Sequence, residues 1–227
     1  MFEKQLIKTR REIDEKKVKL FTDMKDVYSI SCVVSDAMHR NGTMKSYIKP
    51  RAADKKIIGP AVTVKLTAGD IVDCLIAFQN AKPGDVIVID AFGESTTSIW
   101  GGLMSGLAKN AGVVGAVIDG SCRDTDEAKM LDFPIHSAFV NPRAAHTAES
   151  GRDYPIEINV PIVCGGIIVN PGDIVVADEI GCAVIPYDDI DEVYERAMIQ
   201  AKNEELSRKD ILNGATKDEL LKKYGRI

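Results

Sequence analysis

Two short segments of the sequence carry residues that could act on an acidic substrate. The first is Gly101-Gly102, which precedes a run with helical apolar spacing. Glycines leave the first backbone N–H groups of a helix uncovered, and these donors, with the positive end of the helix dipole, form an anion site. We therefore expect a substrate carboxylate to bind at the backbone of Gly101, Gly102, Leu103 and Met104.

The second segment is Arg123-Asp124, which follows a short apolar run bounded by glycines. An arginine can hold a carboxylate or an oxyanion with two parallel hydrogen bonds, and an aspartate can bind a hard divalent cation directly or through water. In a parallel sheet, ligands gather beyond the carboxyl ends of the strands. The loop at Gly102 and the loop at Arg123-Asp124 should therefore be neighbours in space.

Each segment also has an ordinary structural interpretation. Two glycines before a helix commonly serve the turn alone. Arg123 and Asp124 could form a surface pair in which Asp124 is the N-cap of the next helix. The residue types alone leave both interpretations open.

The sequence around these segments predicts alternating strands and helices, which is typical of an α/β domain with a parallel sheet. Pro-Gly-Asp occurs twice, at 83–85 and 171–173, each time before a short apolar run that ends in aspartate, so both copies should form similar tight turns. Apolar runs predict strands at 57–66, 86–90, 113–119, 135–140, 156–163 and 166–169, and amphipathic spacing predicts helices at 70–81, 101–111 and 124–130.

The two ends of the chain predict extensions of a single domain that spans 1–227. Charged residues with apolar residues at helical spacing predict a helical N-terminal extension at 1–26. After Pro186 the sequence predicts a long charged helix at 188–212 and then a polar tail, so that 187–227 forms a C-terminal extension.

Composition limits the classes of function. The 227 residues are 45% hydrophobic and carry a formal net charge of −5 with both signs interspersed, so no nucleic-acid partner is expected. The sequence contains no apolar run of membrane-spanning length and no apolar signal region, which predicts a soluble, cytoplasmic protein without a membrane partner. The five cysteines form no Cys-x-x-Cys pair and are expected to be buried free thiols, and the three histidines lack ligand spacing.

The segment from Gly102 to Glu127 carries a more specific pattern. Gly102, twenty residues, Arg123, Asp124, two residues and Glu127 resemble the Gly-x20-Arg-Asp-x2-(Glu/Asp) signature of the RraA-like family, which includes metal-dependent 4-hydroxy-4-methyl-2-oxoglutarate aldolases. The resemblance implies that family's layered β/β/α swivelling-type fold. It continues at 35–38, 59–64, 83–86, 164–166, 171–173 and 185–186, and so covers nearly the whole chain.

The resemblance implies a class II aldolase that releases pyruvate from a small 4-hydroxy-2-oxo acid, with oxaloacetate decarboxylation as a related activity. Asp124 would hold Mg²⁺, Mn²⁺ or another divalent metal, and Arg123 would stabilise the pyruvate enolate. Some members carry an acidic residue at the position of Gly102, so this chain has one proton acceptor fewer there. Glu204 corresponds to a catalytic carboxylate that an adjacent subunit contributes, in a homotrimer or homohexamer.

Other functions and roles remain open. Lys65 could form the Schiff base of a class I aldolase, because it ends an apolar run. Asp90 and Glu94 could orient metal-bound waters, and Asp178 could face a subunit boundary or simply end a strand.

The alternative to an enzyme is a regulator. Some family members are non-catalytic, bind an RNA-degrading endonuclease and lack the intact Arg-Asp pair, which this sequence keeps at Arg123-Asp124. If the chain is an enzyme, recognition of the distal half of the substrate is expected in the loops at 93–98 and 141–153.

Overall fold

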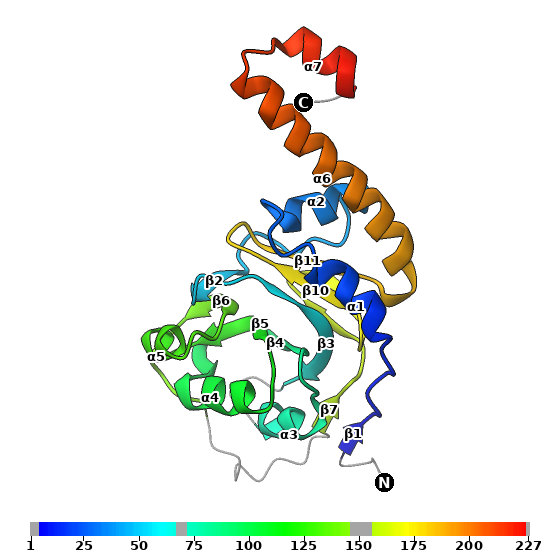
Figure 1. Cartoon of the computed structure of the whole chain (residues 1–227). Helices are drawn as coiled ribbons and strands as arrows, with labels where there is room; N and C mark the ends of the chain where they lie inside the picture. The colour runs from blue at the N-terminus through cyan, green and yellow to red at the C-terminus, as the bar shows by residue number, and fades with distance from the viewer. Residues whose placement is uncertain (1–4, 67–71, 146–155, 226–227) are drawn as a thin grey trace.

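The computed structural model describes residues 5–66, 72–145 and 156–225. Figure 1 shows a central sheet with helices on one face and a second β-layer on the other. The start of the expected helix at 70–81 and most of the expected loop at 141–153 lie outside the described residues. The layered α/β fold that the sequence predicts is confirmed.

Four parallel strands form the centre of the sheet, in the order β3, β4, β5, β6. A helix follows each of the first three strands, and apolar side chains between helices and sheet, including Ile87, Trp100 and Ile118, form one buried cluster. This connectivity places the carboxyl ends of the four strands at one edge. The elements are β3 (Ile57–Lys65), α3 (Val72–Asn80), β4 (Val86–Trp100), α4 (Gly102–Asn110), β5 (Gly115–Cys122), α5 (Thr125–Met130) and β6 (Ile135–Val140).

The second β-layer covers the other face of the sheet. Strand β3 belongs to both layers, because residues 57–60 pair with β10 and residues 61–65 pair with β4. Val88, Val117 and Val175 lie in the buried cluster between the layers. The second layer contains β10 (Ile174–Ala177), β11 (Cys182–Ile185) and the hairpin of β8 (Ile162–Cys164) and β9 (Ile167–Val169).

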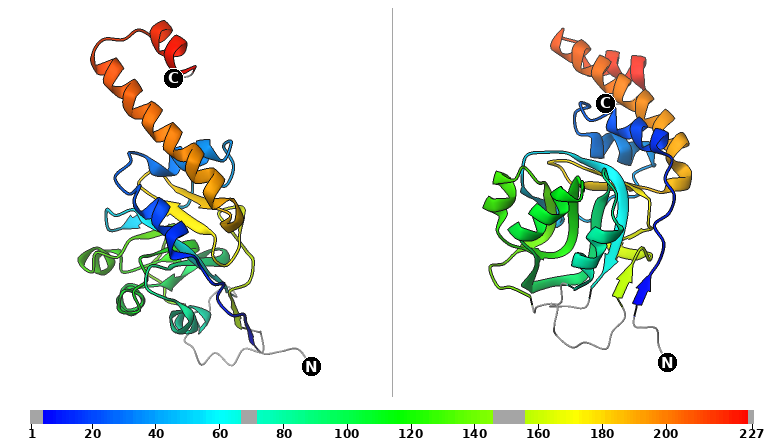
Figure 2. Two further views of the ribbon diagram at one scale, coloured as in Figure 1. Left: turned by 45° about the vertical axis from the view of Figure 1, so that its right-hand side comes forward. Right: turned by 60° about the horizontal axis from the view of Figure 1, so that its bottom comes forward.

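Helices cover the outside of the second layer (Figure 2). Buried side chains of three helices, among them Phe21, Val33 and Val193, pack against β10 and β11. The longest of these helices, α6, then continues beyond the body of the domain, and α7 lies beside its far end (Figure 1). The helices are α1 (Glu15–Thr22), α2 (Ile30–Ala37), α6 (Ile190–Leu212) and α7 (Lys217–Tyr224).

The N-terminal segment differs from the helical extension expected at 1–26. It contains the short strand β1 (Gln5–Ile7), which pairs in parallel with β7 (Ile156–Ile158), and α1 begins only after its N-cap Asp14. Between β1 and α1, Arg10 forms an ion pair with the buried Asp85. Helix therefore occupies residues 15–22 of the expected extension, whereas partners far along the chain hold the described residues before it extended.

Several strand boundaries also differ from the sequence prediction. The expected loop at 93–98 belongs to β4, which continues to Trp100 with an irregular register against β5. The single strand expected at 156–163 is divided at Asn159, whose φ of 56° breaks the extended conformation. Strand β5 extends to Cys122 rather than 119, and β2 (Lys49–Ala52), which pairs with β6, was not predicted.

Both Pro-Gly-Asp segments form the tight turns that the sequence predicts. Gly84 and Gly172 have φ values of 92° and 89°, which favour glycine. In each turn the aspartate accepts a hydrogen bond of 2.8 Å from the backbone N–H three residues earlier, Asp85 from Lys82 and Asp173 from Asn170.

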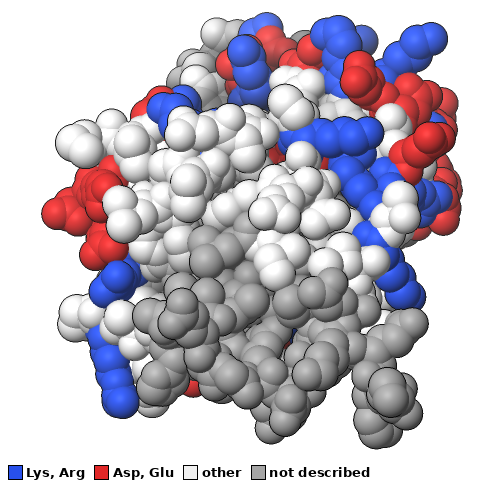
Figure 3. All heavy atoms as spheres, turned by 90° about the horizontal axis from the view of Figure 1, so that it is seen from below, with Lys and Arg blue, Asp and Glu red and all other residues white. Residues whose placement is uncertain are grey.

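Charged side chains are intermixed on the surface. Seen from below, the described acidic and basic residues lie mostly round the margin of the molecule, and uncharged side chains fill much of the area between them (Figure 3). No helix among the described residues is both long enough and apolar enough to cross a membrane.

Candidate active site

A buried tryptophan fixes the turn between β4 and α4. Trp100 stacks on Phe133 and donates a hydrogen bond from Nε1 to Oγ of Ser105 at 3.0 Å. The Ser105 hydroxyl in turn donates to the carbonyl of Gly101 at 3.1 Å. These contacts determine where α4 begins and therefore where its first amides point.

The N-cap residue of α4, Gly101, has no side chain that could cap the helix, as the two glycines predict. The amide of Gly102 donates to Oδ2 of Asp124 at 3.2 Å. The amides of Leu103 and Met104 find no acceptor among the residues that the structure describes. Because the helix dipole is positive at this end, the start of α4 can take a carboxylate.

Strand β5 brings Arg123 and Asp124 to the same place. The amide of Arg123 donates to the carbonyl of Trp100 at 2.9 Å, so the loop after β5 runs beside the turn that starts α4. Asp124 has a φ of 51°, a left-handed conformation that is strained for a residue with a side chain. It occupies the N-cap position of α5, but its side chain makes no capping bond and reaches Gly102 instead. This geometry argues against a purely capping role.

Arg123 and Asp124 form a loose and accessible pair. The distance from Arg123 Nε to Asp124 Oδ2 is 3.5 Å, and each side chain is 41% exposed. Such a pair contributes little to stability, so both groups remain available to a ligand. A Cβ on Gly101 would lie 2.7 Å from Asp124 Oδ2 and 3.3 Å from Arg123 Nε, so a side chain at position 101 would push these groups away from the start of α4.

The carboxylate of Glu127 lies against Gly102. A Cβ added at Gly102 would stand 1.9 Å from Glu127 Oε2, closer than any non-bonded contact. Glu127 therefore occupies the space that a side chain at position 102 would need. Sequence reasoning included Glu127 in the motif without a role, although its place three residues after Asp124 puts both on one face of the first turn of α5.

This donor set suits a hard divalent cation. Asp124 and Glu127 present two carboxylates to the same uncapped helix end. No group of three or more His, Cys, Asp or Glu residues placed to bind a metal occurs in the described part of the chain. Mg²⁺ keeps several of its waters and needs only one or two protein carboxylates, so two are sufficient.

Comparison with known proteins agrees with this geometry. The family model described as RraA-like, Aldolase/RraA, matches residues 31–184. The chain belongs to the RraA-like family. A Halalkalibacterium halodurans protein, provisionally named a 4-hydroxy-4-methyl-2-oxoglutarate aldolase, is 39% identical over 178 residues, which are 78% of this chain and 82% of that protein.

Two solved structures resemble the whole RraA-like domain. An uncharacterised protein from Pseudomonas syringae pv. tomato matches with a TM-score of 0.78 and 25% identity, over 99% of this chain and 98% of that one. An RraA protein of Streptomyces coelicolor, described as an unusual member of the RNase ES inhibitor RraA family, matches with a TM-score of 0.74 and 27% identity, over 88% of this chain and 100% of that one.

The RraA-like chain does not bring Glu204 to Arg123 and Asp124 within one subunit. Glu204 lies on α6, accepts a hydrogen bond from Gln200 at 2.6 Å and pairs with Arg208 at 3.3 Å. It lines a pocket between α6 and α7. Its role opposite an adjacent subunit stays a prediction.

The other acidic candidates serve the second β-layer. Asp90 and its register partner Asp119 accept hydrogen bonds from the amides of Val163 and Gly165, in and directly after β8. Burial raises the pKa of the Asp90 carboxyl, and neighbouring Asp119 adds to the effect. Asp178 receives the amide of Ser31 in the first turn of α2, so within this chain it organises a turn and a helix start.

The remaining candidates are also placed. Lys65 ends β3 and lies 3.8 Å from Glu157, on the opposite side of β4 from β5, the strand that precedes Arg123. Cys32 is exposed, which contradicts the expectation of buried thiols; Cys122, Cys164 and Cys182 are buried. Cys32 lies on α2 between the buried residues Ser31 and Val33, and its own side chain points away from the core.

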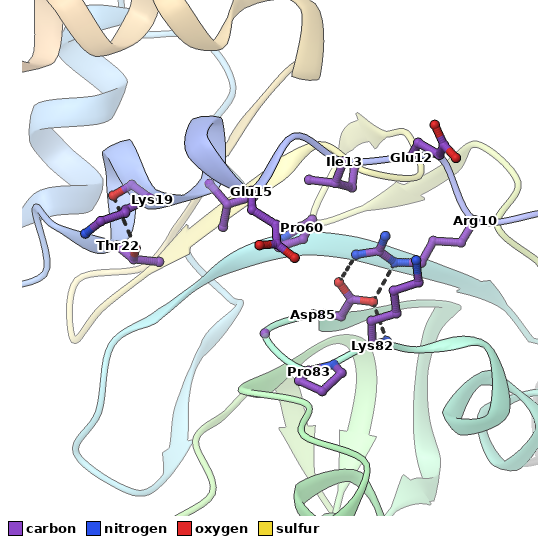
Figure 4. Close-up of a pocket in the computed structure, with 12 residues that line it drawn as sticks. Arg10, Glu12, Ile13, Glu15, Lys19, Thr22, Pro60, Lys82, Pro83 and Asp85 are labelled. Carbon is purple, nitrogen blue, oxygen red and sulfur yellow. Dashed lines mark hydrogen bonds and ion pairs between the residues drawn. The ribbon is translucent and has the colours of Figure 1, made fainter.

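A separate cavity of about 420 Å³ lies between the N-terminal segment and the first Pro-Gly-Asp turn (Figure 4). Its wall includes Arg10, which donates from Nε to Asp85 at 2.7 Å, and the exposed end of Lys82. The Arg10 guanidinium already donates hydrogen bonds to Asp85 and to the carbonyl of Arg11. The cavity is therefore the space left where the ion pair of Arg10 and Asp85 joins the two segments.

Proposed function

We propose that this protein is a cytoplasmic, divalent-metal-dependent class II aldolase. It cleaves a 4-hydroxy-2-oxo acid, such as 4-hydroxy-4-methyl-2-oxoglutarate, and releases pyruvate. Oxaloacetate decarboxylation is the second activity, because it passes through the same pyruvate enolate. The observation that carries the proposal is the convergence of Arg123, Asp124 and Glu127 on the uncapped start of α4.

The residues of this chain divide the work of binding and charge stabilisation. The backbone amides of Leu103 and Met104 bind the carboxylate next to the 2-oxo group. Arg123, which packs along Gly101, donates to the 2-oxo oxygen as it gains negative charge. Asp124, with Glu127 beside it, would hold a divalent cation, which would supply Lewis acidity toward that oxygen when bound.

Cleavage also needs a proton acceptor and a proton donor. A base takes the proton of the 4-hydroxyl, the C3–C4 bond breaks, and its electron pair forms the enolate while C4 becomes the carbonyl of the second product. Protonation at C3 then gives pyruvate. We assign the accepting role to Glu127, because it fills the place where other members carry an acidic side chain at position 102.

A pyruvate-release assay tests the proposal. The panel contains 4-hydroxy-2-oxo acids and oxaloacetate, with Mg²⁺, with Mn²⁺ and with EDTA. We expect turnover that EDTA abolishes, that either metal restores and that Asp124→Ala eliminates. If activity survives EDTA and borohydride traps pyruvate covalently on Lys65, the protein instead follows the class I route.

We further propose a homotrimer or homohexamer in which Glu204 of one subunit completes the site of another. Its position on the protruding α6 supports this assignment, since α6 extends beyond its own domain (Figure 1). Mixing inactive Asp124→Ala and Glu204→Ala subunits after partial denaturation should restore part of the activity if the residues act across an interface. Light scattering measures the assembly; a monomer, or mixtures without recovery, would contradict the shared site.

The second candidate function is a non-catalytic regulator that binds and inhibits an RNA-degrading endonuclease. The similarity to the Streptomyces coelicolor protein supports it, because that structure is described as a member of an RNase inhibitor family. Wild-type protein that turns over no substrate of the panel but slows RNA cleavage by such an endonuclease would favour this function.

A further inference from the structure

The segment after β6 crosses the carboxyl end of β5 and joins β4. Asn141 donates its amide to the carbonyl of Cys122 at 3.0 Å, and the carbonyl of Arg143 accepts the amide of Ser98 at 2.8 Å. Ala144 forms an isolated parallel bridge with Ser98. Cys122 directly precedes Arg123, and β4 leads into α4. The crossing therefore places Arg143 beside the proposed active site.

Hydrogen bonds fix the backbone of this segment, although the side chains at 142–144 are exposed. The Asn141 side chain donates to the carbonyl of Ser95 at 2.9 Å and accepts the amide of Arg143 at 2.9 Å. The hydroxyl of Ser98 donates to the Asn141 carbonyl. Arg143 itself is exposed. It thus combines a fixed backbone with a guanidinium that can reach a ligand.

Glu94 provides a fixed negative charge near Arg143. Its Oε1 accepts hydrogen bonds from the amide and hydroxyl of Thr96 at 2.5 Å and from the amide of Thr97 at 3.1 Å. The Glu94 carbonyl accepts from Ser121 on β5 at 2.9 Å. The bonds from Thr96 lower the pKa of the Glu94 carboxyl, and the charge of Arg143 adds to the effect. A hydrogen-bonded carboxylate on β4 therefore attracts the guanidinium of Arg143 by charge.

Arg143 keeps donors available. No ion pair within 4.0 Å joins it to an acidic residue in the described part of the chain. Arg51, also beside this edge of the sheet, is committed to the carbonyls of Ser137 and Ala138. Next to Ser98, the buried hydroxyl of Thr97 has no partner among the described residues. This edge therefore retains unused hydrogen-bonding capacity.

We infer that Arg143 binds the distal carboxylate of the substrate and so selects 4-hydroxy-2-oxo diacids over monoacids. The inference rests on the proposed function, in which the start of α4 and Arg123 already hold the pyruvyl end. A second carboxylate needs a second cation, and a guanidinium can hold it with two parallel hydrogen bonds. Arg143 therefore determines substrate specificity and does not contact the atoms of the bond that is cleaved.

The first test compares 4-hydroxy-4-methyl-2-oxoglutarate, a diacid, with 4-hydroxy-2-oxopentanoate, a monoacid, on wild type, Arg143→Gln and Arg143→Lys. We expect Arg143→Gln to raise KM for the diacid roughly 10- to 100-fold, the effect of one lost charge-assisted hydrogen bond, with little change in kcat. Cleavage of the monoacid should be unchanged, and Arg143→Lys should restore part of the diacid affinity. Lys129→Gln, the same charge change at an exposed site on α5, is the control.

Calorimetry gives a second readout without turnover. The non-cleavable diacid 2-oxoglutarate and the monoacid 2-oxopentanoate are titrated into the Mg²⁺-loaded protein. Wild type should prefer the diacid, and Arg143→Gln should lose that preference. An equal effect of Arg143→Gln on both ligands, or none on either, overturns the inference. Absence of cleavage by wild type with the binding preference intact would count against the aldolase and leave the role of Arg143 supported.

Discussion

The Glu127 carboxylate occupies the space beside Gly102: its Oε2 lies only 1.9 Å from the position that a Cβ of residue 102 would take. The glycine at 102 and the acid at 127 are therefore one structural unit. A change at either residue should be felt at the other.

Gly102→Ala should displace Glu127 and reduce kcat roughly 100-fold, because small displacements of catalytic groups have effects of that size. Gly106→Ala, in the same helix, is the matched control, because its Cβ would meet only Leu131 Cδ1 at 3.9 Å. Replacing glycine by alanine inside a helix also stabilises it by about 1 kcal/mol. Steady-state kinetics and urea unfolding separate the two effects. Equal activity of both variants would show that Glu127 has no part in turnover.

Stability should fall below about pH 6.5 because of His136. Its Nε2 lies 2.8 Å from the carbonyl of Asp178 and must donate, and its buried Nδ1 has no partner among the described residues. Burial lowers the pKa of His136, so the unfolded chain binds the proton more readily than the folded one. The contribution of neutral His136 to the free energy of unfolding is fully present above the pKa of the unfolded chain. As the pH falls below about 6.5, the free energy of unfolding decreases by up to about 1.4 kcal/mol per pH unit.

Urea unfolding between pH 5 and 8 measures this dependence. His136→Gln keeps a donor for Asp178 and should flatten the profile, whereas His39→Gln, at an exposed position, should leave it as in wild type. A profile for His136→Gln that matches wild type would assign the pH dependence to other groups.

Arg10→Met should lower the free energy of unfolding by about 3 kcal/mol, because it leaves a buried carboxylate without its cation. Asp85 is fully buried and the Arg10 side chain is only 14% exposed. Lys19→Met breaks a pair with Asp23 in which both side chains are at least 60% exposed, and should change stability by less than about 1 kcal/mol. Similar losses in both variants would mean that Arg10 acts through general charge balance.

Thiol labelling of the native protein should modify Cys32 much faster than Cys122, Cys164 or Cys182. Only Cys32 among these four is exposed, and burial raises the pKa of the Cys164 thiol well above its usual range. Peptide mass spectrometry after brief treatment with a maleimide reads each site separately. Rapid modification of Cys164 would show that the β8–β9 hairpin opens readily.

Local patterns in the sequence predicted the framework of the site well. Apolar runs and glycines predicted the start of β4 at 86 and a helix at 101–111, close to the observed α4, and the motif spacing paired the start of that helix with Arg123-Asp124, but the continuation of β4 to Trp100 was not predicted. The left-handed backbone of Asp124 was not predictable, because aspartate adopts it only where surrounding contacts enforce it.

Features that depend on distant partners were missed. Strand β1 has only three residues and pairs with β7 some 150 residues later, so nothing near it in the sequence indicates extension. Helix α7 is different: Thr216 and Glu219 form a capping box, a local signal that was readable within the expected polar tail. The position of Glu204 relative to another subunit depends on assembly and has no signal within one chain.

The pairing of β1 with β7 also orders events during synthesis. Strand β1 is synthesised before the four parallel strands, yet its partner at 156–158 emerges only after all four have been made. Closing so long a loop is slow, and the parallel core gains nothing from waiting for it. Strand β1 is therefore among the last elements to reach its native position, and a nascent chain stalled before residue 156 should expose it to proteases.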